Sequence, residues 1–310
     1  MKLIFLGTPQ FSVPFLRTVN SSHHEVLAVI TNPDRKKGRG MRVTLPPIKR
    51  EAIKLGLKVY QPQNINDPEF ISQIKKLKAE AGVIVAYGRI LKKELIEIMK
   101  KGWINLHPSL LPKYRGPSPI QWAILNGDSN TGITTTFLEE MMDSGDIILQ
   151  KKIKIKENDT FGKLKRIIEK EGCKLLIDTL DLIENEKVKI TVQDDNLATY
   201  TQKITKKFSV INWNNPAKKI YNQIRALNPT PGAYTNLRGR NLKIYVSQIT
   251  NRKSSLPPGS VVTSSPKKGL FIATSDYLIR LFILQPQDRN KMKDVEFLRG
   301  YQVKRGDILG

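Results

Sequence analysis

Cysteine, acidic side chains and long apolar runs are all scarce in this sequence. A single cysteine, Cys173, occurs among 310 residues, so an intramolecular disulfide and a cysteine-based metal site are both excluded. The apolar run LIFL near the N-terminus is too short for a signal peptide or a membrane span. We therefore expect a protein of a reducing, cytoplasmic compartment that does not enter the membrane.

Basic residues greatly outnumber acidic ones. The chain has 52 Lys and Arg against 28 Asp and Glu, a formal net charge of +24. A folded protein with this charge usually meets a polyanion, either nucleic acid or an anionic membrane. No lipidation motif or basic amphipathic helix accompanies the charge, which favours nucleic acid. The hydrophobic share of 39% excludes a wholly disordered chain.

The first half of the chain alternates short apolar runs with amphipathic stretches, the pattern of an α/β domain with a Rossmann-like, mostly parallel sheet. The predicted strands cover residues 2–6, 25–31, 58–61, 82–86, 103–107 and 133–138. The predicted helices cover residues 69–80, 92–99 and 160–186, and the last of these should close the first domain.

The periodicity changes after a polar stretch in the second half of the chain. Strand-like segments at 243–249, 260–263 and 270–284, with one helix at 216–227, predict a smaller, OB-like β-barrel domain. We expect a first domain at 1–189, a linker at 190–204 and a basic second domain at 205–310. The second domain has 19 Lys and Arg against 5 Asp and Glu, so it is the more basic per residue.

Glycine is missing where a dinucleotide-binding loop would need it. Gly7 follows the first predicted strand, but Thr8, Pro9, Gln10 and Phe11 come next, so the G-x-G-x-x-G fingerprint is absent. A nicotinamide-dependent oxidoreductase is therefore disfavoured. A turn at this place can still bind another ligand, because open α/β sheets bind ligands at the carboxyl ends of their strands.

Polar side chains suited to carbonyl chemistry follow the strand at 103–107. Asn105 and His107 alternate on that strand, so both side chains emerge on one face. An asparagine amide donates to an oxyanion, and histidine serves as acid or base near neutral pH. Asp143, in a turn-forming Asp-Ser-Gly sequence, is either a plain turn residue or the carboxylate that orients His107. No serine or cysteine nucleophile elbow and no H-E-x-x-H metal spacing is present, so we expect metal-free acid–base chemistry.

A basic segment punctuated by glycine and proline covers residues 32–49. It is interpreted either as a loop that contacts phosphates and becomes ordered on binding, or as a solvated insertion. The candidate phosphate contacts are Arg35, Lys36, Lys37, Arg39 and Arg42.

Residues 105–116, NLHPSLLPKYRG, and 132–146 resemble the two signatures of the folate-dependent formyltransferases. Residues 32–40, with the pattern PDRxxGRG, resemble an insertion of one narrower family among them, and residues 224–234 resemble its C-terminal signature. Together the four stretches resemble the methionyl-tRNA formyltransferase family. Thr230 stands where that family commonly has tryptophan.

The resemblance implies formyl transfer from 10-formyltetrahydrofolate to the α-amino group of methionyl initiator tRNA. It implies that Asn105, His107 and Asp143 are catalytic and that Arg39 discriminates between tRNAs. We expect a monomer that binds tRNA and folate. The implied folate contacts are Ser109, Leu110, Leu111, Pro112, Tyr87, Gly88 and Leu91.

Two other functions stay open. A formyltransferase or hydrolase that acts on glycinamide ribonucleotide or an amino sugar would share the three catalytic residues, but would need neither the Arg39 segment nor a basic second domain. A pure nucleic-acid-binding protein would explain the charge, but would leave Asn105, His107 and Asp143 without a role.

Overall fold

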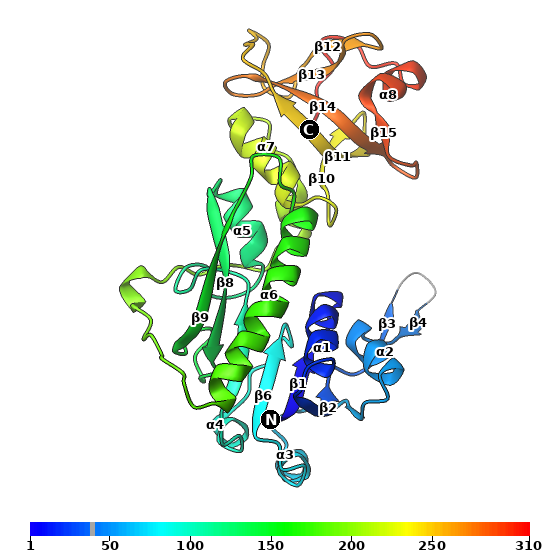
Figure 1. The fold of residues 1–310 in the computed structure, drawn as a ribbon. Helices are drawn as coiled ribbons and strands as arrows, with labels where there is room; N and C mark the ends of the chain where they lie inside the picture. The colour runs from blue at the N-terminus through cyan, green and yellow to red at the C-terminus, as the bar shows by residue number, and fades with distance from the viewer. Residues whose placement is uncertain (38–40) are drawn as a thin grey trace. The chain divides into compact units, whose positions relative to one another are not determined.

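The computed structural model describes residues 1–37 and 41–310 (Figure 1). The described chain forms two compact units. The first comprises Met1–Gly116, Thr131–Ile153 and Arg166–Tyr200, and the second Pro117–Asn130, Lys154–Lys165 and Thr201–Gly310. Among the described residues, no helix is both long enough and apolar enough to cross a bilayer.

A seven-stranded sheet in the order β5-β2-β1-β6-β7-β8-β9 forms the centre of the N-terminal half. Its strands are β1 Lys2–Gly7, β2 Glu25–Ile30, β5 Val59–Tyr60, β6 Ala81–Val85, β7 Trp103–His107, β8 Asn130–Phe137 and β9 Ile147–Lys154. β1 is parallel to β2 and β6, β6 is parallel to β7, and β7 is antiparallel to β8. The predicted α/β class with a mostly parallel sheet is confirmed.

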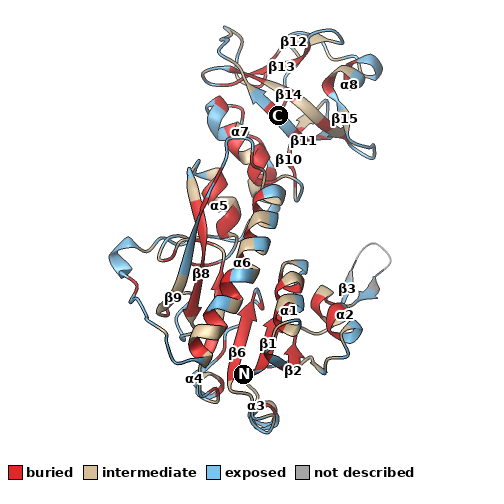
Figure 2. Cartoon of the chain, in the orientation of Figure 1, coloured by how far each residue is buried: buried red, intermediate tan, exposed pale blue. Residues whose placement is uncertain are grey.

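Helices lie between these strands along the chain. They are α1 Val13–Asn20, α2 Pro47–Lys54, α3 Pro68–Lys75, α4 Lys93–Ile96 and α5 Pro119–Leu125, together with the 3-10 turn Gln10–Ser12. α6 Phe161–Glu184 and the 3-10 turns Asp195–Leu197 and Lys206–Ser209 follow the last strand. β6 is buried along its whole length, as Figure 2 shows, because parallel strands are covered on both faces. The helix predicted at 160–186 is α6, whose buried positions include Ile168, Leu176 and Leu180.

The C-terminal unit contains an antiparallel sheet in the order β10-β11-β14-β13-β12, with β15 paired to β14. Its elements are α7 Ala217–Ala226, β10 Ala233–Leu237, β11 Arg240–Ile249, β12 Val261–Ser265, β13 Gly269–Ala273, β14 Leu278–Pro286, β15 Met292–Lys293 and α8 Asp294–Gly300. The chain end joins the two outer strands: the Leu309 N–H donates to the Gly259 carbonyl (2.9 Å) and the Gly310 N–H to that of Asn236 (3.0 Å). The predicted second domain of antiparallel strands is confirmed.

The helix predicted at 69–80 is α3, which ends at Lys75, and the helix predicted at 92–99 is only the short α4 Lys93–Ile96. Two further predicted segments differ from the structure. The strand-like run 270–284 is two strands, because Asp276 Oδ1 accepts hydrogen bonds from the Ala217 and Tyr277 N–H groups and so fixes a turn. The basic segment 32–49 contains a hairpin, β3 Arg35–Lys37 with β4 Arg42–Thr44, and the start of α2. Propensity did not indicate the hairpin, since its strands have only three residues each.

A close contact between Gly82 and Trp103 holds β6 against β7. A Cβ on Gly82 would lie 1.9 Å from Cε3 of the buried Trp103 ring, whose Nε1 donates to the Leu95 carbonyl at 3.0 Å. Only glycine leaves room for this indole, and its hydrogen bond fixes how the ring lies.

Gly82→Ala should therefore lower the free energy of unfolding by about 1–3 kcal/mol, the usual cost of overpacking. Urea denaturation of the purified protein measures the effect. Gly300→Ala is the matched control, since a Cβ there meets no atom within 4 Å. Equal stability of both variants would contradict this interpretation of the contact.

Candidate active site

Asn105, His107 and Asp143 come together on one face of β7. Asn105 and His107 are alternate residues of β7, and Asp143 lies in the loop between β8 and β9. Asn105 Nδ2 donates to Asp143 Oδ1 at 3.1 Å, and His107 Nδ1 lies 3.4 Å from the same oxygen. The Gly116 N–H donates to Asp143 Oδ2 at 2.8 Å. The carboxylate of Asp143, from the second motif, therefore faces three groups of the first motif, residues 105–116.

The ring of His107 lies between two acceptors. Its Nε2 is 2.9 Å from the Tyr114 carbonyl, and because a carbonyl only accepts, Nε2 carries the proton. Burial lowers the pKa of His107, but the charge of Asp143 and both hydrogen bonds outweigh burial, so the pKa is raised. Burial likewise opposes the ionisation of Asp143, yet His107 and the other donors lower its pKa. The pair therefore favours imidazolium and carboxylate.

The turn that carries Asp143 is tightly constrained. Asp143 has φ +53°, a left-handed conformation that aspartate tolerates better than most residues. A Cβ on Gly145 would lie 1.9 Å from the Phe137 carbonyl oxygen, so this position requires glycine. The Asp-Ser-Gly sequence is therefore a turn and also presents the carboxylate to His107, which unites the two interpretations of Asp143.

Sequence reasoning missed two residues of this site, Arg115 and Gln193. Arg115 lies inside the first motif, yet its side chain is buried and donates to Gln193 Oε1. Gln193 Nε2 donates to the carbonyls of Asp143 and Gly145. Gln193 lies in the polar segment predicted as a linker, where no motif or periodicity distinguished it.

The predicted folate contacts divide by burial. The side chains of Ser109, Leu111, Tyr87 and Leu91 are buried. The Ser109 hydroxyl donates to the Lys113 carbonyl at 2.6 Å, and burial raises the pKa of Tyr87 to about 12. These four side chains belong to the protein interior. Gly88 is exposed, and Leu110 and Pro112 are partly exposed.

Four of the five predicted phosphate contacts belong to the β3–β4 hairpin. Arg35 and Lys36 are exposed on β3, and Lys37 pairs with Arg42 across the hairpin. Arg39 lies outside the described residues.

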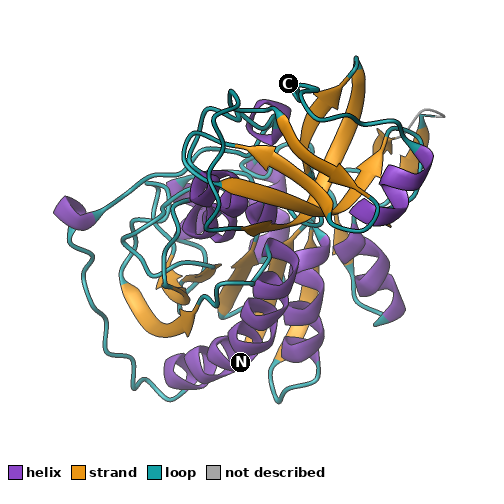
Figure 3. Ribbon diagram, turned by 90° about the horizontal axis from the view of Figure 1, so that it is seen from above, coloured by secondary structure: helices purple, strands orange, loops and turns teal. Residues whose placement is uncertain are grey.

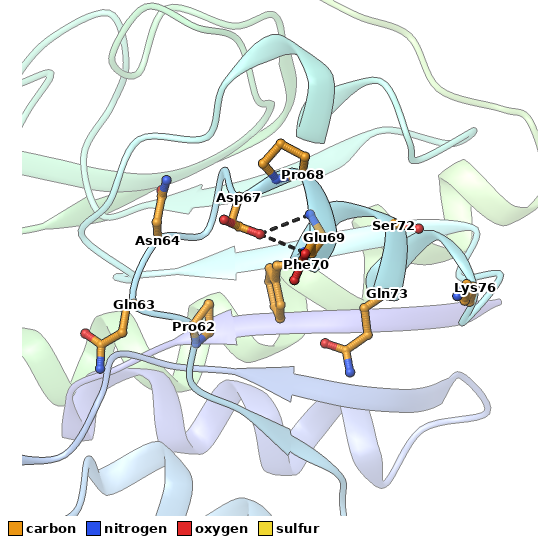
Figure 4. Close-up of a pocket in the computed structure, with 10 residues that line it drawn as sticks. All are labelled: Pro62, Gln63, Asn64, Asp67, Pro68, Glu69, Phe70, Ser72, Gln73 and Lys76. Carbon is orange, nitrogen blue, oxygen red and sulfur yellow. Dashed lines mark hydrogen bonds between the residues drawn. The ribbon is translucent and has the colours of Figure 1, made fainter.

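A hollow beside α3 is lined by none of the predicted site residues (Figure 4). Pro62, Phe70 and Lys76 contribute to its wall, and Asp67 Oδ1 caps α3 by accepting from the Glu69 and Phe70 N–H groups. Asp67, the carboxylate that could hold a ligand most directly, is therefore used by the helix itself.

The only group of potential metal ligands found among the described residues is His23, His24, Asp181 and Glu184. This group lies at the N-terminal end of β2, whereas His107 lies at the C-terminal end of β7. Because these strands run parallel, the two groups lie at opposite ends of the strands. Glu184 accepts a hydrogen bond from the Met1 amino group at 2.6 Å and lies 2.8 Å from His23 Nε2. The cluster is an ion-paired contact between the start of β2 and the end of α6.

This contact should make stability depend on acid pH. Hydrogen bonds from the Met1 ammonium and His23 lower the pKa of Glu184 to about 2 from an ordinary 4.5. A lowered pKa in the folded state stabilises the protein above the ordinary value, and the stabilisation disappears as pH falls from about 4.5 towards 2. Glu184→Gln should therefore lower the Tm near neutral pH but have little effect near pH 2. Thermal melts across this range measure the difference, and a constant gap would contradict the prediction.

Two protein-family models match the sequence of this chain. The formyl transferase family model matches residues 1–180, and the model for the formyl transferase C-terminal domain matches residues 203–302. These matches define the chain as a formyl transferase.

Curated relatives narrow the class. The methionyl-tRNA formyltransferase of Caldanaerobacter subterraneus is 40% identical over 310 residues and is covered completely, as is this chain. That of Bacillus subtilis is 41% identical over 310 residues, with 100% of this chain and 98% of the relative covered. The chain belongs to the methionyl-tRNA formyltransferase family.

Solved structures of lower identity share the fold. The N-formyltransferase from Helicobacter canadensis, in complex with folinic acid and dTDP-3-aminofucose, superimposes with a TM-score of 0.68 at 23% identity, covering 92% of this chain and 99% of its own. HypX from Aquifex aeolicus gives a TM-score of 0.65 at 16% identity, covering 99% of this chain and 49% of its own. At these identities, the likeness shows the architecture alone.

Proposed function

We propose that this protein transfers the formyl group of 10-formyltetrahydrofolate to the α-amino group of methionine on initiator tRNA, as a monomer in the cytoplasm. The observation that carries the proposal is the cluster of Asn105, His107 and Asp143 in a chain whose full-length relatives are methionyl-tRNA formyltransferases. The folate supplies an activated formyl group, and no metal is required.

The catalytic residues divide the work. A neutral amine attacks the formyl carbon, and an oxyanion develops on the formyl oxygen. The contact of Asn105 with Asp143 uses one of its two amide hydrogens, so the other can donate to the oxyanion. Imidazolium His107 adds positive charge beside it. Asp143 orients His107 and, through water, takes the proton from the attacking amine. The same proton then passes to the folate nitrogen as the bond between that nitrogen and the formyl carbon breaks, which leaves Asp143 ionised again.

The folate fits the sheet edge where β6 and β7 end. Gly88 follows β6, and Leu110 and Pro112 follow β7. Parallel strands bring these segments to the same edge, which also carries His107. We propose that exposed backbone at Gly88 and the partly exposed Leu110 and Pro112 line the pterin site, with Ser109, Leu111, Tyr87 and Leu91 supporting it from the interior.

The basic groups are assigned to tRNA. The hairpin residues Arg35, Lys36, Lys37 and Arg42, together with Arg39, contact the acceptor end, and residues 205–310 hold the phosphate backbone. This assignment keeps a catalytic domain at 1–189 and a linker at 190–204. The fold shared with the sugar N-formyltransferase leaves a small-amine acceptor as the second candidate. Formyl transfer assayed with methionyl-tRNA, free methionine and an amino sugar distinguishes the two.

Single substitutions of the catalytic residues should slow the reaction without weakening tRNA binding. We expect Asn105→Ala, His107→Ala and Asp143→Ala each to lower kcat by about 100- to 10,000-fold, since each removes acid–base or oxyanion stabilisation. Steady-state kinetics and filter binding of methionyl-tRNA measure the two effects separately. A His107→Ala enzyme that works at full rate would disprove the proposed roles.

Arg39→Ala should act on the tRNA instead. We expect a higher KM for methionyl-tRNA, an unchanged KM for the folate, and a slope of log affinity against log salt smaller by about 1, because one phosphate contact is lost. Lys76→Ala, which removes an exposed lysine at the C-terminal end of α3, is the matched control. An unchanged salt slope would leave Arg39 without the proposed contact.

A further inference from the structure

A polar segment outside the signature motifs contacts both the loop that follows β7 and the start of β9, beside the turn that carries Asp143. Residues 191–200, here called the strap, are loop apart from one short helix (Figure 3). Thr191 forms a backbone bridge with Ile147 at the start of β9. At the other end, the Thr199 carbonyl accepts from the Arg115 N–H at 2.8 Å, and Thr199 Oγ1 accepts from the Tyr114 N–H at 2.8 Å. The strap is therefore attached to both loops of the site.

Gln193 of the strap contacts the Asp143 turn directly. Its Nε2 donates to the carbonyl oxygens of Asp143 at 3.0 Å and Gly145 at 2.7 Å. Its Oε1 accepts from Nε of Arg115 at 3.2 Å and from Nη2 at 2.9 Å. Carbonyls only accept and a guanidinium only donates, so the amide has one possible orientation. Gln193 is 8% exposed, which makes the loss of these bonds costly.

Arg115 links Gln193 to the other side of Asp143. The side chain of Arg115 is 1% exposed and also donates to Asp195 Oδ1 at 2.7 Å and to the Tyr200 hydroxyl at 3.3 Å. The next residue, Gly116, donates its N–H to Asp143 Oδ2. The main chain of Asp143 is thus held through Gln193, and its carboxylate through the residue beside Arg115.

We propose that Gln193, oriented by Arg115, is a positioning residue that sets the Asp143 carboxylate against Asn105 and His107. This inference rests on the proposed function, since it takes Asp143 as catalytic. The left-handed backbone of Asp143 needs outside support, and the two hydrogen bonds from Gln193 provide it. A small rotation of this turn would lengthen the 3.4 Å approach of Asp143 to His107.

Two variants test the role. Gln193→Glu keeps an acceptor for Arg115 but removes both donors, and Gln193→Met removes donors and acceptor at similar length. We expect each variant to lower kcat by about 10- to 100-fold and to leave the KM for methionyl-tRNA nearly unchanged. The substitution should misplace the reacting groups without weakening the binding of the substrate. Asn196→Ala is the control in the same strap, since the exposed Asn196 side chain donates to Asp194 Oδ1 within its own turn.

The titration of His107 distinguishes positioning from mere stability. Asp143 is the charged group that faces His107, so its displacement should move the His107 titration, followed by NMR in the full chain, to lower pH. The chain has 3 histidines, and His107→Ala identifies the signal. Folded Gln193 variants with wild-type kcat and an unmoved His107 titration would overturn the proposal.

Two further outcomes are separable. If both Gln193 variants fail to fold, Asp195→Asn and Tyr200→Phe weaken the hold on Arg115 from the exposed side, and a wild-type kcat and His107 titration in both would equally overturn the proposal. If the wild-type enzyme does not formylate methionyl-tRNA, the proposed function fails. The His107 titration needs no substrate and still decides whether Gln193 positions Asp143.

Discussion

The carboxylate of Asp143 is the group on which the site depends. It accepts from the Asn105 amide and the Gly116 N–H and faces the ring of His107, so residues from two loops and a strand meet at a single charge. Several donors are needed because burial alone would disfavour the ionised form. The same donors also fix where Asn105 and His107 point. The same hydrogen bonds therefore keep Asp143 ionised and hold Asn105 and His107 in place.

The antiparallel strand β8 explains how Asp143 reaches β7. β8 ends at Phe137, opposite Ile104, so the chain leaves the sheet beside the start of β7 rather than beside His107. The loop returns to β9 through a backbone bond from the Phe137 N–H to the Asp146 carbonyl. It therefore lies over the face on which the alternate residues Asn105 and His107 emerge.

Much of this could be predicted from local sequence. The strand at 103–107 has the predicted bounds, and the three catalytic candidates meet. Gln193 could not be predicted, because its importance comes from contacts at sequence separations of 48 to 78 residues. The turn at Asp276 was hidden for the same reason: its partner Ala217 is 59 residues away. Periodicity shows which residues are buried, but not which buried polar groups bond to each other.

The partners of the other buried carboxylates support the proposal that Asp143 is the catalytic one. Other carboxylates inside this basic protein face partners that keep their charge: Glu51 accepts from Arg17, and the buried Asp294 from Arg280. A guanidinium does not give up its proton, so such pairs only stabilise the fold. Asp143 instead faces an imidazole, which exchanges its proton near neutral pH, and an amide that can donate to an oxyanion. The cluster at His24 pairs imidazole with carboxylate too, but it contains no such amide and lies at the opposite sheet edge. Among the described carboxylates named here, only Asp143 therefore contacts both an imidazole that can exchange a proton and an amide that can donate to an oxyanion.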